Sequence, residues 1–127
     1  MCTKARFLVG ALAILALNAP LMAHHSVAVN FDTSREIIIE GVLTEVVWRN
    51  PHSRFRVDVT EENGSTVEWL VEFGAFNTLN RAGFPSESFA VGDSITITGN
   101  PGRNGQRSMR FRVALHAGRR LTEAMSP

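Results

Sequence analysis

An Asn-Pro turn separates the two clearest strand signals in this sequence, and it limits how the chain can fold. Residues 35–47 before the turn are rich in Ile and Val, and residues 54–59 after it alternate polar with apolar side chains, as a half-buried strand does. Pro51 has no N–H and disfavours the helical region for the residue before it, so the chain must turn here. We therefore expect two strands joined by a turn with Trp48 at its start and His52 at its tip.

The first residues predict that the protein is exported. Lys4 and Arg6 precede an apolar run over residues 7–17, and small or aliphatic residues continue to Ala23, which is the pattern of a secretory signal. A membrane span would need about 20 apolar residues, so we expect cleavage after Ala23, no membrane span in the mature chain, and a periplasmic or secreted location. The predicted organisation is a signal peptide at 1–23, an N-terminal arm at 24–34, a barrel domain at 35–121 and a tail at 122–127.

Composition narrows the classes of function. The single cysteine, Cys2, leaves with the signal, so the mature domain has no disulfide and depends on its core. The formal net charge is only +1 at pH 7, so we do not expect bulk nucleic-acid binding. The sequence contains no nucleophile elbow, phosphate loop or distinctively spaced carboxylate pair, so we do not expect an enzyme.

The clearest hairpin joins residues 55–59 to residues 67–73. A two-residue Asn-Gly turn would put an apolar residue opposite a charged one, whereas a three-residue loop over 62–64 keeps both apolar faces together. The longer loop requires Gly64 to be left-handed and sets Arg54 opposite Glu72 on the outer face, where we expect an ion pair. In the preceding strand, Gly41 marks the expected bulge.

The remaining elements predict the fold class. A short helix over 75–82 is followed by packing anchors at Phe84, Phe89 and Val91, and then by strands over 94–99 and 107–115. Three strands, a helix and two strands is the order of an OB-fold, a five-stranded, partly open barrel; a small β-sandwich is the alternative. Ligands of this fold usually lie on strands 2 and 3 and in the loops that here cover residues 48–53 and 100–106.

The histidines form the first candidate site. Cleavage after Ala23 would give His24 both a free amine and an imidazole, a chelating pair to which His25 or His52 can add a further nitrogen. Such nitrogen ligands suit Cu(II) and, less selectively, Ni(II) or Zn(II), so we consider copper or another transition metal a possible cofactor. The alternative is a solvated terminus and a turn whose His52 faces water.

Arginines form the second candidate site. They crowd the last quarter of the chain, at Arg103, Arg107, Arg110, Arg112, Arg119 and Arg120. Arg110 and Arg112, with Trp48 and Asn50 of the turn, could bind an anionic ligand or an oligonucleotide. The favoured interpretation is a solvated face on which glutamates pair with these arginines, the available glutamates being Glu40, Glu45, Glu68 and Glu72.

Two further predictions concern the edge of the sheet and the remaining His and Trp residues. An exposed edge strand could make the domain a structural or protein-partner module of the cell envelope. We expect His116 to be a surface residue, and Trp48 and Trp69 to be packing residues rather than stacking platforms.

The chain resembles a family of small secreted bacterial domains of unknown function. Four motifs carry the resemblance, in this order: Ala23-His24-His25-Ser26, Trp48-Arg49-Asn50-Pro51-His52, Val67-Glu68-Trp69 and Gly92-Asp93-Ser94-Ile95-Thr96-Ile97-Thr98-Gly99. Members of that family start the mature chain with Ala-His-His-Ser, so the resemblance marks His24, His25 and His52 but implies no established activity. It also leaves open a cut before Ala23, which would put His25 third and create an amino-terminal Cu(II)/Ni(II) motif.

Overall fold

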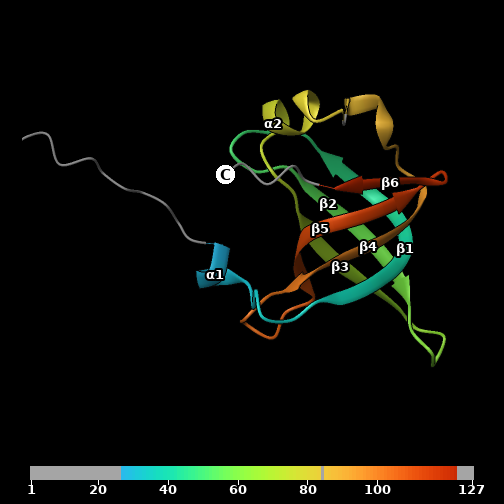
Figure 1. Cartoon of the computed structure of the whole chain (residues 1–127). Coiled ribbons are helices and arrows are strands. Elements are labelled where there is room, and N and C mark those ends of the chain that lie inside the picture. Colours follow the sequence, from blue (N-terminus) through green and yellow to red (C-terminus); the bar gives the residue numbers. More distant parts are fainter. Residues whose placement is uncertain (1–26, 84, 123–127) are drawn as a thin grey trace, which may run out of the picture.

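The computed structural model describes residues 27–83 and 85–122 (Figure 1). The strands are β1 Ile37–Val47, β2 Arg54–Thr60, β3 Thr66–Glu72, β4 Ser94–Pro101, β5 Ser108–His116 and β6 Arg119–Thr122. The helices are α1 Val27–Asn30, α2 Phe76–Arg81 and a single 3₁₀ turn, Ser86–Ser88. Within these residues no helix has the length and apolar character needed to cross a bilayer.

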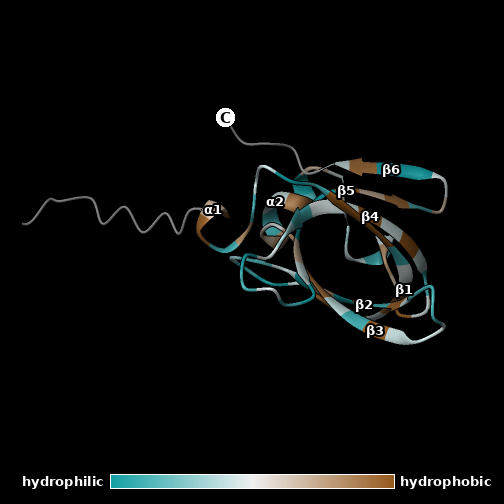
Figure 2. Ribbon diagram, turned by 90° about the horizontal axis from the view of Figure 1, so that it is seen from below, coloured by the Kyte–Doolittle hydropathy of each residue, from teal (hydrophilic) through white to brown (hydrophobic). Residues whose placement is uncertain are grey.

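Five of the strands close into a barrel, which confirms the predicted OB-like fold and excludes the sandwich. The strand order is β3-β2-β1-β4-β5-β6 with antiparallel neighbours, and a parallel pairing of β3 with β5 closes the ring. Figure 2 looks at this ring from below, with β6 lying alongside β5. The barrel is therefore closed rather than partly open, and β6 is a sixth strand that the sequence pattern did not predict.

The β2–β3 hairpin has the predicted register. Arg54 lies opposite Glu72 and Val59 opposite Val67, and Gly64 has a φ of 83° in a loop closed by the pair Glu61–Ser65. Phe55, Val57, Val71 and Phe73 are fully buried, and Val59 and Trp69 pack against them.

Aromatic rings fill the centre of the barrel. Phe73 lies between Phe55 and Phe111, with ring centroids 4.1 Å and 4.2 Å away, and all three side chains are fully buried. Ile95 and Ile97 of β4 also face inward, as their alternation predicts. Removing one of these buried phenyl groups typically costs about 3–5 kcal/mol, so the cluster is a main source of stability.

Two β-bulges lie where the sequence analysis did not place them. In β1 the register shifts between Leu43 and Glu45, not at Gly41, so the bulge prediction was wrong. Gly41 is instead required by close packing, because a Cβ there would overlap the carbonyl oxygen of Asp58. In β5 the extra residue is Arg112, and the alternation therefore reverses after Phe111.

The second bulge overturns the predicted end of β5. The alternation that buries Met109 and Phe111 predicts Leu115 in the core if it continues along the strand, but Leu115 is 50% exposed, whereas Ala114 is fully buried. Of the three packing anchors predicted between α2 and β4, Phe89 is buried, Val91 is 66% exposed, and Phe84 lies outside the described residues.

The described part of the predicted N-terminal arm, residues 27–34, is docked on the barrel. Residues 27–30 form α1, and Phe31 is buried at 7% exposure in a β-bridge to Gly102. The N–H of Asp32 then donates to the carbonyl of Pro101 at 2.8 Å. The segment is thus docked on the end of β4 and the start of the β4–β5 loop, through backbone groups of Pro101 and Gly102.

Candidate functional site at the β1–β2 turn

The turn over residues 48–53 is tied to the end of β3 by backbone hydrogen bonds. The N–H of Ser53 donates to the carbonyl of Gly74, and the N–H of Phe73 donates to the carbonyl of Ser53. The buried Ser53 hydroxyl lies 3.3 Å from both the N–H and the carbonyl of Arg49. A turn with these contacts has a defined position on the barrel, so it can present side chains in a fixed place.

Trp48 and Asn50 serve this turn as structural contacts. The Trp48 ring packs edge-on against Phe55 and Phe76, at 5.3 Å and 5.9 Å, which agrees with its predicted packing role. The Asn50 side-chain oxygen accepts the N–H of Asn77 in α2 at 3.3 Å. Both candidate ligand residues thereby join the turn to α2.

His52 is presented at the rim, with its ring directed to a carboxylate. Its Nδ1 lies 3.4 Å from Glu72 Oε1, and its side chain is 49% exposed. Among the described residues, Glu72 is the polar contact of the His52 ring, and it contacts Nδ1. Nε2 is therefore the nitrogen that remains for a ligand.

Arg110 approaches the same carboxylate oxygen from β5. Its Nη1 lies 3.5 Å from Glu72 Oε1, and its side chain is only 12% exposed. The parallel pairing of β3 with β5 sets these two residues opposite each other. The expected ion pair of Glu72 with Arg54 is replaced by these contacts with His52 and Arg110, although the predicted register is correct.

Other arginines of the outer face also pair with glutamates, although Arg56 is not among the arginines named in the sequence analysis and Glu61 is not among the glutamates named there. Arg56 binds Glu45 at 2.8 Å and also Glu68, and these hydrogen bonds raise the pKa of Arg56. Arg107 lies 3.2 Å from Glu61. Arg56, Glu68 and Arg107 border an open hollow of about 680 Å³ over β2, β3 and the β4–β5 loop. Arg112 is exposed at the bulge of β5.

His116 lies in a second polar pair and is not the surface residue that we expected. Its side chain is 17% exposed, its Nε2 lies 2.8 Å from Asp93 Oδ2, and its ring centroid is 5.1 Å from that of Phe89. The N–H of Ala90 and then His116 hold the pKa of Asp93 below its ordinary value. The sequence offered only the Gly92-Asp93 turn as a signal, and nothing in the local pattern joins it to the end of β5.

The structure describes only one of the three predicted metal ligands. His24 and His25 lie outside the described residues, so His52 is the one member of that set whose position is known. Within residues 27–83 and 85–122, no group of three His, Cys, Asp or Glu side chains is arranged to hold a metal ion.

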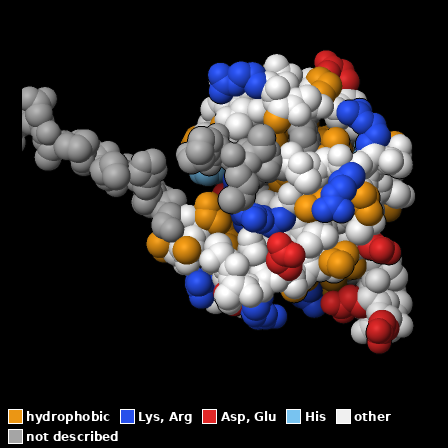
Figure 3. Space-filling view, in the orientation of Figure 1, with side chains coloured by type: hydrophobic (Ala, Val, Ile, Leu, Met, Phe, Trp, Pro, Cys, Tyr) orange, Lys and Arg blue, Asp and Glu red, His pale blue; other side chains and the backbone are white. Residues whose placement is uncertain are grey.

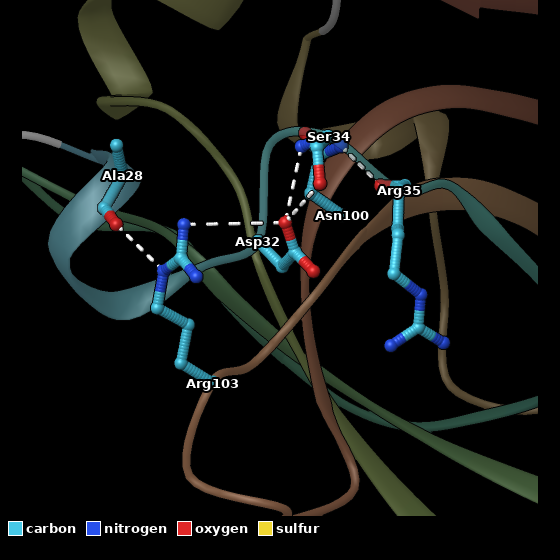
Figure 4. Close-up of polar contacts among 6 residues, drawn as sticks. All are labelled: Ala28, Asp32, Ser34, Arg35, Asn100 and Arg103. Carbon is cyan, nitrogen blue, oxygen red and sulfur yellow. Dashed lines mark hydrogen bonds and ion pairs between the residues drawn. The ribbon is translucent and has the colours of Figure 1, made fainter.

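The start of the described chain is clamped by Arg103 (Figure 4). Its Nε donates to the carbonyl of Ala28 at 2.8 Å, its backbone N–H donates to the carbonyl of Asn30, and its Nη2 lies 3.9 Å from Asp32 Oδ1. Hydrogen bonds from Ser34 lower the pKa of Asp32, which keeps its charge available to Arg103.

This clamp places α1 on the same side of the barrel as His52. Phe31 is bridged to Gly102, the N–H of Gly102 donates to the carbonyl of Ser108, and Ser108 lies beside Leu70. Leu70 is two residues before Glu72, the neighbour of His52. Phe31 lies three inter-strand spacings across the sheet from Leu70, and Glu72 lies two residues further along β3. Together these two displacements separate Phe31 from Glu72 by roughly 16 Å.

Comparison with solved structures shows the same barrel in single-stranded DNA-binding proteins. The small single-stranded DNA-binding protein of Streptomyces coelicolor is 26% identical, with a TM-score of 0.52 over 65% of this chain and 91% of that one. The mitochondrial single-stranded DNA-binding protein Rim1 of S. cerevisiae is 10% identical, with a TM-score of 0.51 over 76% of this chain and all of that one. At 10% identity, the likeness to Rim1 shows the fold alone. No curated protein matches the chain.

A family model matches residues 11–110, a range that includes the histidine motifs, the first four strands of the barrel and the start of β5. This confirms the expected membership of a family without an established activity. The chain belongs to DUF6152, a family of unknown function.

Proposed function

We propose that this protein is a small OB-type binding domain of the cell envelope that holds one Cu(II)-like ion. The ligands are the amine and imidazole of His24, the Nε2 of His52 and, as a further donor, His25. The observation that carries the proposal is the orientation of His52, whose Nδ1 lies 3.4 Å from Glu72 Oε1 on a half-exposed ring.

The contact of His52 with Glu72 resembles the setting of metal-binding imidazoles in general. A histidine that binds a metal through one nitrogen usually donates its other N–H to a carboxylate or carbonyl, which fixes the ring and raises its basicity. Glu72 itself is held by Arg110 at 3.5 Å. The carboxylate is therefore positioned before any ion arrives, and the ring needs only a small rotation to bring 3.4 Å within hydrogen-bond range.

The reach of the N-terminal ligands is compatible with this site. His24 is three residues before Val27, so its backbone can lie up to about 10 Å from the start of α1. The Arg103 clamp holds α1 on the β3–β5 side of the barrel, and roughly 16 Å separates Phe31 from Glu72. The one turn of α1 and the three residues before it are together long enough to cover that separation.

The set of nitrogen ligands determines which metal ion the site prefers. An amine and two or three imidazole nitrogens favour Cu(II) over the other available divalent ions. We propose carriage or sensing of the ion rather than catalysis. Signal cleavage after Ala23 is part of the proposal, because it gives His24 the free amine.

The test is a calorimetric Cu(II) titration of mature protein whose first residue has been established by mass spectrometry. We expect one ion per chain. His52→Ala should weaken binding at least about tenfold, as should one extra residue before His24, whereas the control His116→Ala should bind like the parent. Equal affinity in all four proteins, or binding no tighter than that of a free His-His peptide, would refute the proposal.

A second candidate function is the binding of an anionic ligand or short oligonucleotide, and the likeness to the Streptomyces coelicolor single-stranded DNA-binding protein favours it. Two features weigh against it. Arg56, Arg107 and Arg110 lie against carboxylates, and the outward-facing positions of the described β2 and β3 carry no aromatic residue for base stacking.

The two candidates are separated by fluorescence anisotropy with a labelled single-stranded oligonucleotide at low salt. Binding that falls steeply with added salt and is lost in Arg112→Ala would favour the second candidate. Absence of binding would leave the metal proposal as the better one.

A further inference from the structure

One outer face of the barrel, formed by β1, β4, β5 and β6, carries a row of four residues that lie side by side across the strands. Glu40 pairs with Thr96, Thr96 with Leu115, and Leu115 with Arg120. All four side chains point outward, because the residues next to them, Ile39, Ile97, Ala114 and Leu121, are buried. The row therefore has a negative end, a small polar residue, a large apolar residue and a positive end.

The centre of this row is a shallow hollow between apolar side chains. Ser94 and Thr96 of β4 form its floor, and Val42 of β1 and Leu115 of β5 line its sides. Val42 and Leu115 are 41% and 50% exposed. Ile38, which is 67% exposed, lies on the same face two residues before Glu40. Figure 3 shows the side on which β1, β4 and β5 face the viewer, with orange side chains between blue and red ones.

We propose that this face binds a second copy of the chain about a two-fold axis that passes between Thr96 and Leu115. Such an axis brings each residue of the row opposite its counterpart from the other end, as an isologous interface requires. Leu115 of one chain then sits on Thr96 of the other, in the hollow. Glu40 of each chain meets Arg120 of the other.

The arrangement fits a copy of this chain better than an unrelated partner. One surface carries both the apolar group and the small residue that accommodates it, and it also carries both of the opposite charges. Leu115 supplies the apolar group and Thr96 the small residue that accommodates it. Glu40 and Arg120 are both exposed, and three strand spacings, roughly 14 Å, separate their backbones within one chain. Their charges are therefore complementary between two chains, not within one.

The size of the face predicts a weak dimer. Four strands span roughly 15–20 Å, so a patch of that width in each direction covers roughly 200–400 Å². This is less than the ~800 Å² per partner of a standard interface. We expect a monomer–dimer equilibrium that sedimentation velocity detects between about 5 µM and 1 mM, with a dissociation constant in that range.

Charge reversal tests the pairing directly. Glu40→Arg and Arg120→Glu should each weaken dimerisation about tenfold or more, because each puts like charges together at both ends of the interface. The double variant should recover the parent affinity. An equimolar mixture of the two single variants should form heterodimers, since both ion pairs are restored between unlike chains.

Leu115→Ser should also weaken the dimer, whereas Val91→Ser, at an exposed residue outside this face, should not. Circular dichroism confirms that each variant is folded, which is expected because the changed side chains are exposed. A monomer throughout the concentration range would overturn the proposal. So would a dimer that is indifferent to the charge reversals, or a mixture of single variants that does not associate.

Discussion

Glu72 on β3 and Arg110 on β5 lie opposite each other in the parallel pairing that closes the barrel, with 3.5 Å between Oε1 and Nη1. The same carboxylate oxygen is 3.4 Å from His52 Nδ1 in the β1–β2 turn. One carboxylate therefore contacts both a residue of the strand that closes the barrel and the candidate ligand.

Glu72→Gln should weaken copper binding. The amide keeps the size of the side chain but removes the charge that orients and polarises the imidazole, an effect typically worth about ten- to a hundredfold in metal affinity. Calorimetric titration measures it. The control is Glu45→Gln, which alters a carboxylate paired with Arg56 away from His52. A Glu72→Gln affinity equal to that of the parent would show that the carboxylate has no such role.

Arg110→Ala should destabilise the barrel. The arginine side chain is 12% exposed, and its loss leaves a partly buried carboxylate with one partner fewer, so we expect the free energy of unfolding to fall by about 1–3 kcal/mol. Urea unfolding followed by Trp fluorescence gives the value. Arg81→Ala in α2 is a suitable control at an exposed arginine. Equal midpoints for the two variants would contradict this account of closure.

Gly41→Ala should cost more stability than Gly64→Ala. At Gly41 the new methyl group would overlap the carbonyl oxygen of Asp58 in the paired strand, so the strands must separate locally. At Gly64 there is open space, and only the left-handed φ of 83° opposes the change, at about 1 kcal/mol. Urea unfolding of both variants checks the order, and the reverse order would show that β1 and β2 separate easily.

Acid should remove the contribution that Asp93 makes to stability. The Ala90 N–H and His116 lower the pKa of Asp93 in the folded protein. The carboxylate therefore stabilises the fold above its unfolded pKa of about 3.9, and this contribution is lost as the pH falls through the lower folded value. The parent should exceed Asp93→Asn in stability at pH 5 and approach it near pH 2.5 in urea unfolding. A difference independent of pH would contradict the assignment.

Arg103→Ala should release α1 without unfolding the barrel. The side chain contacts the Ala28 carbonyl and Asp32, and these contacts hold the segment on the β4–β5 loop. Amide hydrogen exchange should accelerate at Phe31 and Asp32 but not in β2, and copper affinity should fall because the N-terminal ligands lose their placement. Unchanged exchange would show that Phe31 alone anchors the segment.

Local patterns were sufficient to predict the hairpin and the order of the five barrel strands with α2 between the third and the fourth, but they predicted neither α1 nor β6. The register of β2 and β3 follows from alternation and loop length, and the core positions of Phe55 and Phe73 follow from the same alternation. Leu115 was misplaced because the bulge at Arg112 reverses the alternation, and that bulge arises from pairing with β4 rather than from a local signal.

Contacts between distant segments could not be predicted from the sequence. The pairs Glu72–Arg110 and Asp93–His116 join residues 38 and 23 positions apart and depend on which strands become neighbours. The docking of α1 depends on backbone groups of the β4–β5 loop that no side-chain pattern reveals. The candidate residue His52 was found because the Asn-Pro turn isolates it, but its carboxylate neighbour became evident only in the folded barrel.

The central claim, that His52 binds a metal together with the N-terminus, is tested most directly by pulsed electron paramagnetic resonance of the Cu(II)-loaded mature protein. The modulation from the remote imidazole nitrogen counts the coordinated histidines. We predict that His52→Ala lowers this count by one relative to the parent and that His116→Ala leaves it unchanged. Identical modulation in the parent and His52→Ala would show that His52 is not a ligand.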